Sequence, residues 1–384
     1  MKELITRNYV LLCISNFLQF IIHFLLITAL PIFVGQVLGG SDSQVGLVIG
    51  MYMIGAVMIR PFIGRWMDAY DQKKILSMVA VSFLLPLTCY AVIENVTLFF
   101  LLRFIHGIAF GALTTATLTA VSTSLPRKRT GEGIGYFSMC MTLGIVIGPL
   151  LALSIIEKFG FIALFATCDL LAFLIVMLAI AMRSCYGKKA GEQQPLSIRL
   201  LFEKTTIPLG IIGMCPTFAF AGIATFITLF AQGLGLLPYA AYYFLVSAFV
   251  ILISRPFVGR AFDRINADIL IYPSVIIMAI GLAKLAMAET GADILWSGVL
   301  IGLGNGTLFS CLQSLVIRNA PLGRTGAASS TFFILFDIGS ALGSFCLGFV
   351  AQETGYVVMY FVTAFVAAMT GIFYFFWRRN HKDA

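Results

Sequence analysis

The stretch Arg60–Asp68 reads RPFIGRWMD, and Arg255–Asp263 reads RPFVGRAFD 195 positions later. A second match has the same spacing, because P-R-K-R-T-G at Pro126–Gly131 pairs with P-L-G-R-T-G at Pro321–Gly326. A third match, between two glycine pairs described below, also falls at this offset. Three coincident matches at one spacing predict a chain built from two homologous halves in parallel orientation.

The composition around the repeats indicates a membrane protein. Hydrophobic residues make up 60% of the 384 residues, charged residues make up 11%, and the mean hydropathy is +0.99. Apolar runs such as 9–34, 98–121 and 356–377 each exceed the roughly 20 residues that a helix needs to cross a bilayer core. Twelve such runs follow one another, which predicts an all-α membrane protein of twelve transmembrane helices in two six-helix bundles related by pseudo-twofold symmetry.

The longest polar stretch, 183–204, reads RSCYGKKAGEQQPLSIRLLFEK and separates the two halves. We therefore expect an N-terminal six-helix bundle over 1–183, a cytoplasmic linker over 184–204 and a C-terminal six-helix bundle over 205–384. Because the two halves lie in one chain, we expect the working unit to be a monomer.

The basic residues predict the orientation in the membrane. With the N-terminus inside, all but three of the 25 Lys and Arg residues fall on the cytoplasmic side. The exceptions are Lys158 and Lys284, near external helix ends, and Arg103, inside a helix. We expect a multi-pass protein of a bacterial cytoplasmic membrane with both termini in the cytoplasm.

The sequence offers no pattern typical of an enzyme, a metal centre or a cofactor site. It has no G-x-x-x-x-G-K-[ST] phosphate loop, no H-E-x-x-H, no G-x-S-x-G and no C-x-x-C pair among its eight cysteines. The basic residues are spread over many short loops, which argues against nucleic acid as a partner. We expect no cofactor and no metal, and energy from an ion gradient rather than from ATP.

The repeated stretch and the residues after it resemble the G-x-x-x-D-R-x-G-R-K loop motif of the major facilitator superfamily. Ala69 and Asp71 depart from the motif in the first copy, whereas Arg264 restores it in the second. Seven latch residues carry the resemblance: Gly64, Asp68, Lys73, Lys74, Gly259, Asp263 and Arg264. The resemblance implies that this loop locks one conformation of a transporter and releases it in each cycle.

Physically, the two aspartates of this motif lie at helix ends, where a carboxylate can pair with a basic residue of the loop or with the N-terminus of a neighbouring helix. Such contacts latch a conformation or only anchor the topology, and both interpretations stay open.

Three further motifs resemble the same superfamily. Arg103-x-x-His106-Gly107 is similar to its R-x-x-Q-G motif, with His at the Gln position. A group of small residues and a proline is similar to the motif of its antiporters and exporters: Gly144, Gly148 and Pro149, with Gly339 and Gly343 in the second half. The resemblance implies a gating helix, while close helix packing is the alternative. Leu30-Pro31 in the first helix is common in drug:proton antiporters.

Ionisable residues inside the spanning segments are the candidates for proton coupling, because each is costly in a bilayer unless it is paired or wetted. Asp337 lies 11 residues past Gly326, about 16 Å along a helix, and so near the bilayer midplane. It can carry a proton, form an interhelical hydrogen bond or pair with a cationic substrate. Arg103, His106 and His23 can take part in proton transfer or serve as hydrogen-bonded structural residues. For Asp169 we favour a structural role.

The first helix carries Asn16, Gln19 and His23 where many antiporters of this family carry an acid. We expect Asn16 and Gln19 to contact substrate. Aromatic residues can line an adaptable cavity, and Tyr136, Phe218 and Tyr243 are our candidates, although contact with lipid is the alternative.

The sequence favours a secondary transporter that exports a small amphipathic molecule, such as a drug or a metallophore, by antiport with protons. An uptake permease of the same fold is the alternative. A membrane sensor without transport activity is a more remote one.

Overall fold

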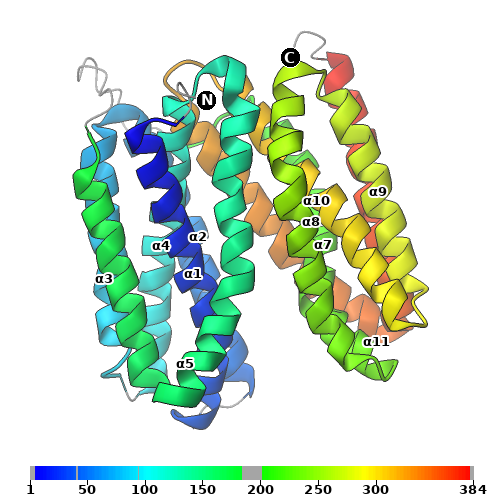
Figure 1. The fold of residues 1–384 in the computed structure, drawn as a ribbon, viewed down its shortest axis with the longest axis horizontal. Coiled ribbons are helices and arrows are strands. Elements are labelled where there is room, and N and C mark those ends of the chain that lie inside the picture. The colour runs from blue at the N-terminus through cyan, green and yellow to red at the C-terminus, as the bar shows by residue number, and fades with distance from the viewer. Residues whose placement is uncertain (1–4, 40–41, 94, 184–200, 381–384) are drawn as a thin grey trace. The chain divides into compact units, whose positions relative to one another are not determined.

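The described part of the chain folds into long helices (Figure 1). The computed structural model describes residues 5–39, 42–93, 95–183 and 201–380. The helices are α1 (Arg7–Gln36), α2 (Asp42–Ala69), α3 (Gln72–Cys89), α4 (Val96–Ser124), a short 3-10 helix η1 (Arg127–Arg129), α5 (Thr130–Ala181), α7 (Ile207–Gly233), α8 (Leu237–Arg264), α9 (Asp268–Ala286), α10 (Gly291–Asn319) and α11 (Thr325–Asn380).

Two of these helices are interrupted. α5 is broken at Gly160 and α11 at Gly355, where φ is 78° and 84°. Positive φ values of this size suit glycine, because a residue with a Cβ is strained there. Counting each broken helix as two, the described residues form twelve α-helical segments and no strand. The predicted all-α fold of twelve helices is confirmed.

Nine of the described helices are long and apolar enough to cross a membrane. Together the elements indicate a multi-pass membrane protein, as expected from the composition.

Polar residues define where several helices begin. The Thr6 side chain accepts a hydrogen bond from the Tyr9 amide at the start of α1, and Asn95 accepts from two amides at the start of α4. Thr290 and Asp293 form a reciprocal capping box at the start of α10. These caps satisfy backbone groups that the first turn of a helix leaves without partners.

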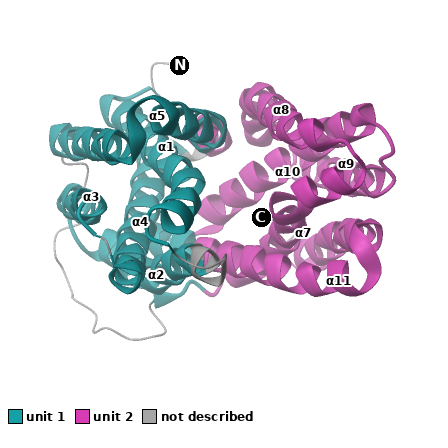
Figure 2. Cartoon of the chain, turned by 90° about the horizontal axis from the view of Figure 1, so that it is seen from below, with its two compact units in different colours: residues 1–126, 140–203, 321–330 teal, residues 127–139, 204–320, 331–384 magenta. Residues whose placement is uncertain are grey.

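The chain divides into two compact units (Figure 2). Unit 1 comprises residues 1–126, 140–203 and 321–330, and unit 2 comprises residues 127–139, 204–320 and 331–384. Each unit therefore includes the first turns of a long helix whose remainder belongs to the other unit. Residues 184–200, most of the expected linker, lie outside the described residues, and the domain boundaries at 183 and 205 stay predictions.

Inside each unit, one helix pair packs through equivalent glycines. In unit 1 a Cβ on Gly107 of α4 would collide with the backbone of Tyr52 in α2. In unit 2 a Cβ on Gly302 of α10 would lie 2.8 Å from the carbonyl oxygen of Ser247 in α8. Both pairs lie 195 positions apart, so the repeat extends to the packing of α2 on α4 and of α8 on α10.

Candidate functional site

Arg103 lies in the interior of unit 1, where α4 carries it, and its side chain is only 1% exposed. Its Nε donates to the Val48 carbonyl oxygen of α2 at 3.4 Å, and its Nη1 donates to the Tyr90 hydroxyl at 3.3 Å. Its Cζ lies 4.0 Å from the centre of the Tyr52 ring, within the range of a cation–π contact. A carbonyl, a phenol and an aromatic face thus stabilise this buried cation.

His106, one turn further along α4, shares the same phenol. The Tyr90 oxygen lies 2.8 Å from His106 Nδ1, and Arg103 Nη1 lies 3.5 Å from the same nitrogen. Because Arg103 donates to the Tyr90 oxygen, the phenol proton is available to donate to Nδ1. A neutral imidazole that accepts at Nδ1 carries its proton on Nε2. Nε2 is buried, with no hydrogen-bond partner among the described residues.

His23 of α1 joins the same region through Tyr52. Its Nδ1 and the Tyr52 hydroxyl share a hydrogen bond of 3.0 Å. Its ring stacks on Phe110 of α4, with 4.4 Å between ring centres and 9° between ring planes. Contacts on two neighbouring helices therefore fix the orientation of this imidazole.

We name His23, Tyr52, Tyr90, Arg103 and His106 the buried network. Among the described residues, no carboxylate forms an ion pair with Arg103. A proton on His106 would place a second positive charge beside the guanidinium. Like charges about 4 Å apart repel each other by roughly 4 kcal/mol at an effective dielectric constant of about 20. Proton binding at this site would therefore push the two side chains apart.

The arginine and the two histidines of the network were candidates on sequence grounds, whereas the two tyrosines were missed. Tyr52 and Tyr90 lie in apolar runs and match no motif. The available signal was indirect, because an intramembrane arginine needs polar or aromatic partners on neighbouring helices.

The polar candidates of the first helix are buried in unit 1. Gln19 Nε2 donates to the Phe110 carbonyl oxygen at 3.3 Å, and Gln19 Oε1 is buried without a hydrogen-bond partner among the described residues. Asn16 is also buried. Gln19 meets the same residue as His23, so α1 and α4 are joined at Phe110 by a hydrogen bond and a ring stack.

The remaining cavity and coupling candidates belong to unit 2. The Tyr136 hydroxyl accepts from Arg260 Nη2 at 2.7 Å. Tyr243 is buried in α8, and its hydroxyl has no hydrogen-bond partner among the described residues. Phe218 in α7 and Asp337 in α11 are half-buried.

The first copy of the repeated motif contacts the start of α11 within unit 1. Asp68 at the end of α2 accepts from the amides of Gly326 and Ala327 at 2.7 and 2.9 Å. A Cβ on Gly64, one turn earlier in α2, would lie 2.7 Å from Ser330 Oγ. The missing side chain lets α2 approach closely enough for the carboxylate to reach the positive end of α11.

The second copy makes the same contact within unit 2. Asp263 at the end of α8 accepts from the amides of Gly131 and Glu132 at the start of α5, both at 2.8 Å. Gly259 lies one turn earlier, where a Cβ would meet the Gly131 carbonyl oxygen at 2.6 Å. All four positions repeat at the offset of 195.

The basic latch residues take no part in these contacts. Among the described residues, the side chains of Lys73, Lys74 and Arg264 form no hydrogen bond or ion pair. The sequence left two partners open for Asp68, a basic residue of the loop or the N-terminus of a neighbouring helix. In the structure, the Asp68 carboxylate accepts hydrogen bonds from amides at the N-terminus of α11.

The small residues of the expected gating helix lie against neighbouring helices. Cβ atoms on Gly144 and Gly148 would lie 2.8 and 2.7 Å from the Cβ atoms of Phe20 and Phe24 in α1, and Pro149 follows inside α5. In unit 2, Gly339 lies against Met214 and Thr217 of α7, and Gly343 lies against Phe218. Close packing is therefore observed in both halves, while gating stays a prediction.

Asp169 lies in the second part of α5, half-buried, and its Oδ1 is buried without a hydrogen-bond partner among the described residues. The structural role that the sequence favoured has no visible hydrogen bond to support it.

Known proteins resemble this chain over nearly its whole length. The staphylopine export protein of Staphylococcus aureus is 22% identical, with 91% of each chain covered. The multi-drug resistance efflux pump of Streptococcus pneumoniae is 23% identical, with 94% of this chain and 93% of that protein covered. Among solved structures, the transporter FucP in its outward conformation superposes with a TM-score of 0.80 at 19% identity, covering 97% of this chain and 99% of FucP.

The family profile described as Major Facilitator Superfamily matches residues 12–344. This match and the twelve helical segments agree with the resemblance carried by the repeated motif. The protein is a transporter of the Major Facilitator Superfamily.

Proposed function

We propose that this transporter exports a small amphipathic molecule, such as a drug or a metallophore, in exchange for protons across a bacterial cytoplasmic membrane, with both termini in the cytoplasm. Relatives of similar length named as a multi-drug efflux pump and a staphylopine export protein support export. The sequence supports both termini in the cytoplasm through the distribution of its basic residues.

The buried network is the observation that carries the proton coupling. Two imidazoles and one guanidinium lie inside a membrane bundle, where such groups are rare and are functional candidates by default. Arg103 contacts Tyr90, which contacts His106, so a charge change at the histidine acts directly on the arginine. Both residues lie on α4, so repulsion between them would displace the Arg103 side chain from Val48 of α2 and from Tyr90, and would loosen the contacts of α4 with its neighbours.

Asp337 is the second coupling candidate. It lies half-buried in α11, two residues before Gly339, which packs on α7. Protonation would neutralise a carboxylate at this depth, and this change of charge would alter the packing of α11. In this proposal, Asp337 and the buried network bind protons in different units of the chain.

The two carboxylate contacts at the helix starts would act as the latch. Each joins the end of one helix to the first turn of a helix whose remainder belongs to the other unit. A carboxylate at a helix N-terminus contributes about 0.3 to 1 kcal/mol when exposed and up to about 2 kcal/mol when partly buried, as both contacts are here. Interactions of this size can hold a state and still break in every cycle.

The test uses everted membrane vesicles with an imposed proton gradient read by a pH-sensitive dye. Lipophilic cations, antibiotics and metallophores are added one at a time. We expect at least one compound to collapse the gradient in vesicles with the wild-type protein. His106→Gln and Asp337→Asn should each reduce this response at least tenfold.

Lys158→Gln serves as the control, because this exposed side chain belongs neither to the latch nor to the buried network and forms no ion pair among the described residues. It should keep the wild-type response. If no compound collapses the gradient although the protein is in the membrane, broad amphipathic export is wrong. If compounds are exported without proton movement, the coupling is wrong.

A further inference from the structure

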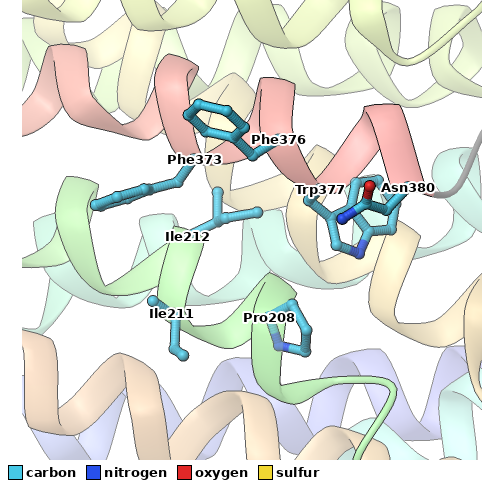
Figure 3. Close-up of a pocket in the computed structure, with 7 residues that line it drawn as sticks. All are labelled: Pro208, Ile211, Ile212, Phe373, Phe376, Trp377 and Asn380. Carbon is cyan, nitrogen blue, oxygen red and sulfur yellow. The ribbon is translucent and has the colours of Figure 1, made fainter.

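Two clefts flank the last turns of α11 in unit 2, and they differ in charge. The cleft against α7 has a volume of about 280 Å³ and is lined by Pro208, Ile211, Ile212, Phe373, Phe376 and Trp377, with Asn380 at its end (Figure 3). It contains no charged residue, so its lining selects only for apolar groups.

The cleft against α9 is larger and basic. It has a volume of about 540 Å³ and is lined by Asp268, Tyr272, Phe375, Arg378 and Arg379. Two guanidinium groups and one carboxylate leave it with one net positive charge. The paired aromatic and basic lining fits a molecule that has both an anionic and an apolar part.

The position of Arg378 is set by contacts with the first turn of α9. Its Nε lies 3.2 Å from Asp268 Oδ2, and the Tyr374 hydroxyl donates to Asp268 Oδ1 at 2.7 Å. The carboxylate is therefore occupied by two partners from α11. Arg379 is exposed, and among the described residues it forms no ion pair.

Apolar side chains continue along α11 from the basic cleft toward the middle of the span. Ile372, Phe375 and Phe376 are 46%, 53% and 57% exposed. Exposed phenylalanines and isoleucines on a spanning helix face lipid tails, while arginines at its end lie at the level of the headgroups.

We propose that this cleft binds one anionic phospholipid. Arg379 and Arg378 bind the headgroup phosphate, which arginine recognises with its planar fork of N–H donors. An acyl chain of the lipid lies along Phe375 and Ile372. Basic pockets between transmembrane helices recognise anionic headgroups in this way. The site is independent of the transported substrate and of proton coupling.

Native mass spectrometry of the full-length protein, extracted from vesicles of equal parts phosphatidylglycerol and phosphatidylcholine, tests this site. We expect one phosphatidylglycerol retained per chain, in at least tenfold excess over phosphatidylcholine. Arg379→Gln should reduce the retained phosphatidylglycerol at least fivefold. Arg264→Gln, at the exposed end of α8, should leave it unchanged.

A second measurement, thermal unfolding, tests whether the variant is folded and whether free phosphate binds at the site. After delipidation in detergent, the thermal unfolding temperature of Arg379→Gln should equal that of the wild-type protein, so that lost lipid does not reflect lost structure. Inorganic phosphate alone should not raise this temperature.

Three results would overturn the proposal. Equal lipid retention by wild type and Arg379→Gln would exclude the cleft as the binding site. An equal loss in Arg264→Gln would indicate general attraction of anionic lipid to basic helix ends. Stabilisation by inorganic phosphate that depends on Arg379 would make the site one for free phosphate.

Discussion

The helix pair α2 and α4 in unit 1 and the pair α8 and α10 in unit 2 share one scaffold and differ in what they bury. Arg103 of α4 corresponds to Gly298 of α10 at the offset of 195. In the second pair, the Tyr243 ring fills the space beside Gly298, because a Cβ on this glycine would lie 3.1 Å from Tyr243 Cδ2. A cation in one half is thus replaced by packed aromatic carbon in the other.

The neighbouring positions follow the same exchange. Tyr52, which lies under the Arg103 guanidinium, corresponds to Ser247, whose hydroxyl donates to the Gly298 carbonyl oxygen at 2.9 Å. His106 corresponds to Ile301, which is buried. The repeat therefore preserved how the helices approach each other, and it preserved a buried arginine at Arg60 and Arg255. The cation at the Arg103 position occurs in one copy only. The close approach of the two helices is therefore compatible with different side chains at the positions of Arg103 and His106.

The largest expected effect tests the shared packing. Gly107→Ala should lower the free energy of unfolding by about 3 kcal/mol, and Gly302→Ala by about 1 kcal/mol, because overpacking of close contacts costs about 1 to 3 kcal/mol. The new Cβ at Gly107 collides with the backbone of Tyr52, which cannot move without α2, whereas the contact at Gly302 is looser. Denaturant unfolding in detergent micelles measures both. Equal losses would mean that the two helix pairs tolerate the same separation.

The next effect tests the chemical difference. Tyr90→Phe removes a hydroxyl bonded to both Arg103 and His106, and should cost about 2 kcal/mol, since buried partners left unsatisfied cost about 1 to 3 kcal/mol. Tyr243→Phe should change stability by less than about 0.5 kcal/mol, because its hydroxyl has no hydrogen-bond partner among the described residues.

The same unfolding assay compares the two variants, and Tyr243→Phe is the matched control as a buried tyrosine of the second copy. A greater loss of unfolding free energy for Tyr243→Phe than for Tyr90→Phe would contradict the assignment of the buried network to unit 1.

A smaller difference is expected between the two carboxylate contacts. Asp68→Asn should cost about 1 kcal/mol and Asp263→Asn about 0.5 kcal/mol, within the range for charges at helix ends. The cost is smaller for Asp263 because Glu132, beside it, carries a like charge that is paired with Arg129 and Arg260. Differences in unfolding midpoints report both values.

Spin-label distances between the cytoplasmic ends of the two halves distinguish a latch from an anchor. A latch predicts that Asp68→Asn broadens the distance distribution toward a second conformation. An unchanged distribution with reduced stability would support the anchor interpretation.

The smallest effect is expected for the basic latch residues. Lys73→Gln and Lys74→Gln should each change stability by less than about 0.5 kcal/mol, as is usual for surface positions. Their side chains form no ion pair with Asp68 among the described residues. A loss as large as that of Asp68→Asn would show that these lysines stabilise the contact through solution electrostatics.

The sequence was sufficient to predict the features that depend on short stretches of the chain, namely the helices, the repeated motifs and the ionisable residues inside the helices. Apolar runs gave the twelve helical segments, because a bilayer demands a fixed length of apolar helix. The offset of 195 identified Asp68 and Asp263 as equivalent. Sequence reasoning also selected Arg103, His106 and His23 as candidates, because ionisable groups are rare in apolar spanning segments.

Only the tertiary structure decided which groups meet. Tyr52 and Tyr90 carry no charge and sit among other aromatic residues, so nothing in the sequence marked them as partners of Arg103. Likewise, Asp68 contacts amides at Gly326 and Ala327, more than 250 residues away, instead of the lysines that follow it in the chain. The surrounding bilayer requires apolar helices of a certain length, and this requirement can be recognised in the sequence. Contacts between helices depend on how small residues let backbones approach, and that distance exists only in the folded molecule.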